Sequence, residues 1–206
     1  QQDQFSSVGR LNILRDSGTI QCSGTLLNDQ WILTAAHCVD DSFNSITYAG
    51  AEGFGPVDEV VINPDWVRND FFGGGDLALL RLRNPVQSAN QAQIYGGTDE
   101  IGEVGTIVGY GRTGTGLTGH FGNSAAFRAG HNTIDVLGTA RGWSDRILLT
   151  DFDSPLNANE SNYGDSEPLD LEYSIAPGDS GGAMFVLTES GWQIAGVSSF
   201  INSTDG

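Results

Sequence analysis

Short apolar stretches recur along the chain, separated by clusters of Gly, Asn, Asp and Ser. Apolar runs bounded by turn residues predict β-strands, and long amphipathic helical patterns are missing. The predicted strands cover residues 6–14, 18–27, 30–35, 57–63, 77–82, 103–111, 146–152, 181–188 and 192–199. Many short strands without an internal repeat predict an all-β fold of the barrel or sandwich type.

One long mid-chain segment, residues 83–102, is polar and rich in turn residues. The predicted strands before and after it form two groups of similar size. We therefore expect two β-barrels joined by this crossing, the first in residues 1–92 and the second in residues 93–206. At 206 residues the chain is long enough to bury a substantial core, as one large domain or two small ones.

The charge balance narrows the function classes. The chain has 26 acidic residues against nine basic ones, all arginine, for a formal net charge of −17. Such a surface repels nucleic-acid phosphates and anionic membranes, so neither is expected as a partner. No apolar run approaches the length of a membrane span, and no basic-then-apolar leader is visible. We expect a soluble, processed chain.

The two cysteines, Cys22 and Cys38, each lie beside a predicted strand. Their positions suit a cross-strand disulfide, and two unpaired core thiols are the alternative. Metal binding is not expected, because neither cysteine has a CxxC partner and His37 is adjacent to Cys38. A disulfide would indicate an oxidising compartment.

The segment APGDSGGAMF, residues 176–185, sets Ser180 between an aspartate and two glycines, directly before an apolar run. Glycines permit a sharp turn that lifts a side chain out of a sheet, and they let a ligand approach the main chain closely. By itself the segment fits an ordinary turn as well as it fits a nucleophile.

Two further segments supply the groups that a serine nucleophile needs: His37 lies in WILTAAHCV and Asp76 in GGGDLALLRL. A histidine can take the serine proton, and a carboxylate on its other nitrogen fixes the tautomer and stabilises the imidazolium. Each residue also has a structural alternative. His37 could be a half-buried histidine, Asp76 a cap on a glycine turn and Ser180 an ordinary turn residue. The order His, Asp, Ser, each beside its own strand, favours a catalytic set with Ser180.

Over most of its length the chain resembles the chymotrypsin/trypsin family of serine endopeptidases. The resemblance is carried by LTAAHC around His37, DLALLRL from Asp76, GYG at 109–111 and GDSGG around Ser180. The order of the three residues separates the chain from subtilisins and α/β-hydrolases. The resemblance implies two six-stranded antiparallel β-barrels, with the active site in the cleft between them.

The resemblance implies a role for each residue. The first barrel would carry His37 and Asp76, and the second would carry Ser180. Ser180 Oγ would attack the scissile carbonyl, His37 would take its proton and later return it to the leaving amine, and Asp76 would orient His37. The backbone N–H groups of Gly178 and Ser180 would form the oxyanion hole.

The same resemblance implies a disulfide between Cys22 and Cys38, no required cofactor, polypeptide substrates and, as further partners, protein inhibitors. We expect a monomer that is secreted or periplasmic, and the short N-terminus and single cysteine pair look bacterial. The alternative is a catalytically silent binding module or an unactivated precursor with the same fold, although no member of the catalytic set is substituted.

A substrate pocket also follows from the resemblance. Its expected residues are Ser174, Ile175, Pro177, Ser198, Ser199 and Phe200. Ser174 stands at the floor, where trypsin-like members hold an aspartate that pairs with Lys or Arg, so a basic P1 residue is disfavoured. Phe200 stands where the family often has a glycine at the mouth, and its bulk should narrow the entrance. We expect a graded preference for small or medium apolar P1 residues.

Asp179 raises a separate question. The family pairs this aspartate with a new N-terminal ammonium, and QQDQFSSVG supplies no apolar segment for that role. A buried carboxylate needs partners, so either upstream residues are missing, or an arginine or a set of N–H donors serves instead. The C-terminal end is short as well, which suggests a fragment or a trimmed domain.

Residues 151–172 carry seven acidic residues and no basic one. Clustered carboxylates could hold Ca²⁺, but no EF-hand spacing is present and a solvated loop explains the charges equally well. Asn159 and Asn202 each begin an N-glycosylation triplet, which matters only in a eukaryotic secretory setting.

Overall fold

The computed structural model describes residues 4–87, 90–122, 126–154, 156–157, 161–164 and 167–202. Within these ranges the chain forms β-strands and short 3₁₀-helices, with no α-helix. The all-β prediction is therefore confirmed. None of the described helices is long and apolar enough to cross a membrane.

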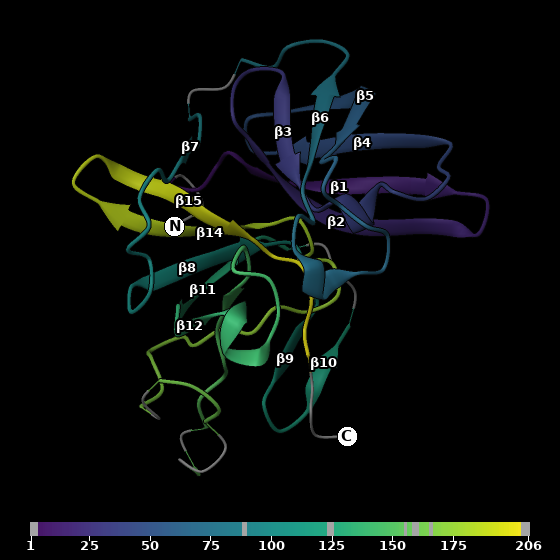
Figure 1. Cartoon of the computed structure of the whole chain (residues 1–206). Helices are drawn as coiled ribbons and strands as arrows, with labels where there is room; N and C mark the ends of the chain where they lie inside the picture. Colours follow the sequence, from purple (N-terminus) through teal and green to yellow (C-terminus); the bar gives the residue numbers. More distant parts are fainter. Residues whose placement is uncertain are drawn as a thin grey trace.

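Six strands close the first barrel, in the order β1-β2-β3-β6-β5-β4, and occupy the upper part of Figure 1. The strands are β1 (Val8–Arg15), β2 (Gly18–Leu26), β3 (Trp31–Thr34), β4 (Ser45–Gly50), β5 (Gly53–Ile62) and β6 (Ala78–Leu82). Alternate side chains of a strand point to one face. Leu11 and Ile13 of β1 accordingly share a core with Leu80 and Leu82 of β6, and all four are fully buried.

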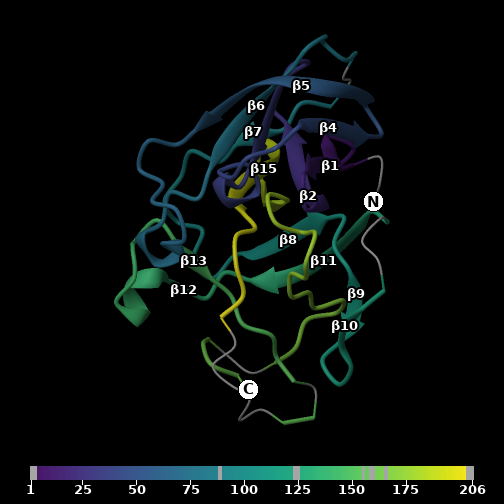
Figure 2. The same ribbon diagram turned by 90° about the vertical axis from the view of Figure 1, so that its right-hand side faces the viewer.

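The second half contains a five-stranded sheet in the order β11-β8-β14-β15-β7 and the strand pairs β9–β10 and β12–β13. Its strands are β7 (Gln93–Ile94), β8 (Val104–Gly109), β9 (Thr113–Thr115), β10 (Gly119–Phe121), β11 (Arg128–Thr133), β12 (Val136–Leu137), β13 (Leu148–Leu149), β14 (Ala183–Thr188) and β15 (Gly191–Val197). Strands β8 to β11 lie below the first barrel in both views (Figures 1 and 2). The arrangement is consistent with the expected two-barrel fold, although the described strands of this half do not close into one sheet and β7 pairs parallel with β15.

The strands that were not predicted from the sequence have only a weak pattern of apolar residues. Strand β4 buries only Ile46 and Tyr48 as large side chains. Strand β11 has the polar sequence RAGHNT and forms because every residue pairs with one of β8. The strand predicted at 146–152 contracts to β13. Tertiary pairing, which one sequence does not display, decides these segments.

An apolar cluster fixes the two halves to each other. Phe5 and Val8, at the start of the first barrel, pack with Val108 and Phe185 of the second half. The Phe5 ring centroid lies 4.8 Å from that of Phe185 and 5.2 Å from that of Trp192. This packing fixes the position of one half relative to the other, so side chains from opposite halves stay at fixed distances from each other.

A disulfide joins Cys22 of β2 to Cys38 of the 3₁₀-helix η1 (Ala36–Cys38) across 16 residues of sequence. The expected pairing is present, and the alternative of two free thiols does not hold. Because η1 contains His37, the bridge ties the histidine segment to the barrel wall.

We expect the double variant Cys22→Ala, Cys38→Ala to lose about 3 kcal/mol of unfolding free energy, the chain-entropy value for a loop of this length. Urea denaturation of the variant and the parent protein measures the difference. Equal midpoints and slopes, or two free thiols found by mass spectrometry of the unreduced parent, would contradict this expectation.

Candidate active site

Strand pairing brings His37 and Asp76 together. Strand β3 pairs with β6 so that Thr34 lies opposite Ala78, and His37 follows the first strand closely while Asp76 precedes the second. Gly75, with a φ of +81°, makes the turn into Asp76. The backbone N–H of His37 donates to Asp76 Oδ1 at 2.8 Å, and His37 Nδ1 lies 2.7 Å from Asp76 Oδ2.

A third residue, Ser199, joins this pair from the other half. It lies two residues after the end of β15, and its hydroxyl donates to Asp76 Oδ2. Ser199 was predicted only as a pocket residue, and its contact with Asp76 was missed because no local signal links residues so distant in sequence. Asp76 thus contacts one partner from each half and is only 8% exposed.

The electrostatics of Asp76 favour its ionised form. Burial raises the pKa of its carboxyl, but the hydrogen bonds and charge of His37 and the hydroxyl of Ser199 lower it more, so the pKa lies below its ordinary value. An ionised Asp76 accepts the Nδ1–H of His37. The histidine is then left with Nε2 as its acceptor.

The turn that carries Ser180 is held through its carbonyl groups. All five backbone carbonyls from Ala176 to Ser180 accept a hydrogen bond of 2.7–3.0 Å. In chain order the donors are the N–H of Asp179, the N–H of Arg112, the Oγ of Ser23, the N–H of Gly182 and the N–H of Ser23. Ser23 belongs to β2 of the first barrel and is fully buried, so both halves fix the conformation of this turn.

Two N–H groups of the turn remain available. Within the described part of the chain, no acceptor bonds the backbone N–H of Gly178 or of Ser180. A peptide N–H points opposite to the carbonyl of its own peptide unit. The bonds to the carbonyls of Pro177 and Asp179 therefore set the directions of these two N–H groups. Buried or half-buried N–H groups are rarely left unpaired, and two such groups next to a serine suit an oxygen anion.

The glycines around Ser180 are required by space and backbone conformation. Gly178 has a φ of +105° and Gly181 a φ of +83°, which side-chain-bearing residues rarely adopt. A Cβ on Gly181 would lie 2.1 Å from Thr34 Oγ1 and 2.3 Å from the carbonyl oxygen of Ser23. The turn therefore packs against the first barrel with no room for a side chain.

Ser180 lies beside the histidine segment. The Cys38 sulfur is 3.8 Å from the carbonyl oxygen of Ser180 and 3.9 Å from His37 Nε2. Among the described contacts, Ser180 Oγ makes no hydrogen bond to His37. Catalytic hydrogen bonds are often long or misaligned before substrate binds and tighten in the complex.

Asp179 is fully buried and has internal partners. Its Oδ1 accepts from the N–H of Gly111 at 2.7 Å, and its Oδ2 accepts from the N–H of Ala176 at 2.9 Å and the hydroxyl of Tyr173 at 2.8 Å. The expectation that a set of N–H donors could serve as the partners of Asp179 is thus met, and the tyrosine donor was not predicted.

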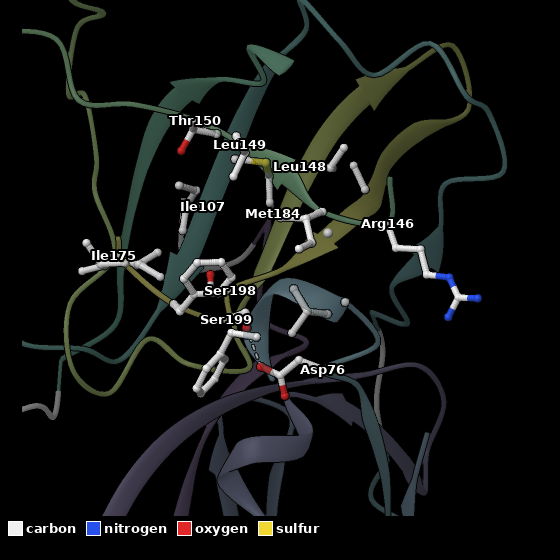
Figure 3. A pocket seen from close by; sticks show the side chains of 18 of the residues that line it. Asp76, Ile107, Arg146, Leu148, Leu149, Thr150, Ile175, Met184, Ser198 and Ser199 are labelled. Atoms are coloured by element: carbon white, nitrogen blue, oxygen red, sulfur yellow. Dashed lines mark hydrogen bonds between the residues drawn. The ribbon is translucent and has the colours of Figure 1, made fainter. Parts of the chain in front are cut away.

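A cavity of about 590 Å³ opens beside Asp76 and Ser199. Ile107, Leu148 and Met184 contribute to its largely apolar wall, across the cavity from the hydrogen-bonded pair (Figure 3). Five of the six expected pocket residues line it: Ser174, Ile175, Ser198, Ser199 and Phe200. Pro177 does not line this cavity.

The ring of Phe200 belongs to an aromatic cluster at the cavity wall. Its centroid lies 5.6 Å from those of Phe71 and Phe72 and 5.8 Å from that of Trp143. Phe71 in turn contacts the ring of His37 edge-on at 5.5 Å. The cluster joins segments of both halves around the histidine.

The acidic segment 151–172 uses several of its carboxylates internally. Asp151 accepts from the N–H of Tyr163 at 2.9 Å, and Glu172 accepts from the N–H groups of Asp153 and Leu169. In the part of the chain that the structure describes, no group of three or more His, Cys, Asp or Glu side chains is arranged to hold a metal ion. Asn159, one of the two glycosylation candidates, lies outside the described residues, and Asn202 is exposed.

Comparison with known proteins matches the chain to one family. The family model described as Trypsin matches residues 5–206. Chymotrypsin-like elastase family member 1 of Rattus norvegicus is 26% identical over 198 residues, which cover 88% of this chain and 68% of that protein. The Homo sapiens protein of the same name is also 26% identical, over 88% of this chain and 70% of its own length.

Two solved structures share the fold. The crystal structure of a thermostable serine protease, AL20, from an extremophilic microorganism has a TM-score of 0.62 and 19% identity, covering 98% of this chain and 88% of its own. A structure titled HL collagenase has a TM-score of 0.66 and 22% identity, covering 96% of this chain and 82% of its own.

Because the pKa of Asp76 lies below its ordinary value, we expect the parent protein and variants at this site to lose different amounts of stability in acid. A group whose pKa is lowered by folding stabilises the protein above its unfolded pKa, and this stability is lost as the pH falls through the folded pKa. Between about pH 5 and pH 3, the parent protein should lose more unfolding free energy than Asp76→Asn, with Ser199→Ala in between. Urea denaturation at several pH values measures this, and parallel curves for all three proteins would refute it.

Proposed function

Because the chain belongs to the trypsin family of serine endopeptidases, we propose that it cleaves peptide bonds with Ser180 as nucleophile, His37 as general base and Asp76 as the residue that orients His37. The double contact between His37 and Asp76 supports this assignment, since it holds the ring through both the backbone and Nδ1. His37 Nε2 then takes the proton of Ser180 and returns it to the leaving amine.

The observation that carries the proposal is the pair of N–H groups, on Gly178 and Ser180, that have no acceptor in the described structure although every carbonyl from Ala176 to Ser180 is bonded. In the tetrahedral intermediate the former carbonyl oxygen becomes an anion, and two donors already oriented toward it need no rearrangement. Each such donor is worth about 3 kcal/mol of transition-state stabilisation.

For the substrate, we propose a small or medium apolar P1 residue. The apolar wall formed by Ile107, Leu148 and Met184 supports an uncharged side chain in the cavity, and Ser174 supplies no counter-ion for Lys or Arg. Phe200 would limit the size of the side chain that enters. Ca²⁺ is not assigned a role, and none of the steps requires a cofactor.

Polypeptides are the substrates of this class of enzyme, and the disulfide supports action outside the cell, where such bonds persist. The division between residues 1–92 and 93–206, the monomeric state, the bacterial origin and the binding of protein inhibitors stay predictions.

Ser180→Ala and His37→Ala should each lower kcat by about 10⁴-fold or more, and Asp76→Asn by about 10⁴-fold. Ser190→Ala and His120→Ala remove exposed residues of the same types and should leave kcat unchanged. Hydrolysis of a chromogenic peptide measures all five variants. Near-parental turnover by Ser180→Ala or His37→Ala would show that the catalytic assignment is wrong.

A peptide library varied at P1 should give graded cleavage that favours small and medium apolar residues. The cleavage rate should fall by about 10- to 200-fold for each methylene by which a P1 side chain departs from the preferred size. Phe200→Gly should extend acceptance toward aromatic P1 residues. Dominant cleavage after Arg or Lys would overturn the proposed specificity.

A further inference from the structure

The partners of Asp179 differ in kind. Two are backbone N–H groups, from Gly111 and Ala176, and in the described structure the only side chain that donates to Asp179 is Tyr173. Burial raises the pKa of Asp179, whereas these donors and the nearby Arg128 lower it, and the pKa stays above its ordinary value. A buried carboxylate is tolerated only when its oxygens are hydrogen-bonded, so each donor matters to its position.

Asp179 is connected to both candidate oxyanion donors. Its own carbonyl accepts from Gly182, which sets the direction of the Ser180 N–H. Its Oδ1 holds Gly111, and the next residue, Arg112, donates its N–H to Pro177 and so sets the direction of the Gly178 N–H. A displacement of Asp179 would therefore disturb both donors, the Ser180 N–H through its backbone carbonyl and the Gly178 N–H through its carboxylate.

Tyr173 is itself firmly placed. Its backbone N–H donates to the carbonyl of His131 at 2.8 Å, and its own carbonyl accepts from Asn132 Nδ2 at 3.1 Å. A Cβ on Gly130 would lie 2.5 Å from Tyr173 Cβ, so strand β11 packs directly against the residue. Burial, followed by the charge of Asp179, raises the pKa of the Tyr173 hydroxyl. The hydroxyl consequently keeps its proton and remains a donor.

We propose that Tyr173 is a positioning residue for catalysis, whose hydroxyl holds the Asp179 carboxylate and through it the N–H donors of Gly178 and Ser180. This inference rests on the proposed peptidase function. It assigns to Tyr173 a contribution to the transition state and not to substrate binding, because Tyr173 does not line the cavity and, among the described residues, its hydroxyl hydrogen-bonds to Asp179.

The test compares Tyr173→Phe with Tyr95→Phe. Tyr95 also donates its hydroxyl to an aspartate, Asp99, but at an exposed site near β7. Tyr95→Phe therefore removes the same group from the same kind of bond, but at a carboxylate other than Asp179. Three quantities are measured for each variant, with the active-site concentration titrated by a fluorophosphonate. They are the kcat and the KM for a chromogenic peptide, and the inhibition constant of a peptide aldehyde of the same sequence. The aldehyde forms a hemiacetal whose oxygen occupies the oxyanion position.

We expect Tyr173→Phe to lower kcat by about 10- to 100-fold, a part of what the loss of one whole donor costs, with KM within about twofold of the parent value. The aldehyde should bind more weakly by a similar factor. Tyr95→Phe should match the parent protein in all three constants.

Unchanged kcat and aldehyde binding in Tyr173→Phe would overturn the inference while leaving the peptidase function intact. A rise in KM with unchanged kcat, or a Tyr173→Phe chain that cannot fold while Tyr95→Phe does, would also overturn it, because either result assigns Tyr173 to binding or to the fold. A parent protein that neither cleaves peptides nor reacts with the fluorophosphonate would instead overturn the proposed function itself.

Discussion

Hydrogen bonding of the backbone carbonyl groups around Ser180 is the constraint on which the rest of the site depends. The carbonyls from Ala176 to Ser180 take donors from the turn itself, from Arg112 and from Ser23 of the first barrel. A buried carbonyl such as that of Gly178 would cost about 1–3 kcal/mol if it were left without a donor. The turn therefore adopts this conformation only when both halves are packed, and the same conformation leaves the N–H groups of Gly178 and Ser180 without an acceptor.

The remaining features of the fold keep the two halves in that arrangement. The cluster around Val8 and Phe185 buries apolar surface from both halves. Asp76 makes a second link, since it accepts from His37 of the first barrel and from Ser199 of the second half. The Cys22–Cys38 bridge holds the histidine segment against the barrel wall next to Ser180. The geometry of the candidate site and the packing of the two halves are thus maintained by the same contacts.

Local patterns in the sequence were sufficient for five of the six strands of the first barrel, all but β4. The apolar runs of β1 and β6 predict strands, and the glycines of PGDSGG predict a sharp turn, in which Gly178 and Gly181 have positive φ angles. The contacts of Ser199 with Asp76 and of Tyr173 with Asp179 could not be predicted, because each depends on how distant segments pack. The polar strand β11 was missed for the same reason, since its pairing with β8 replaces the apolar pattern that a strand search needs.

Fluorophosphonate labelling of the folded protein, followed by peptide mapping, tests most directly whether this arrangement activates Ser180. A serine whose proton is taken by a histidine, and whose adduct oxygen is held by two N–H groups, should react at one position only. We expect a single adduct on Ser180 that forms much more slowly in His37→Ala. Folded protein that takes no label, or an adduct on another residue, would contradict it.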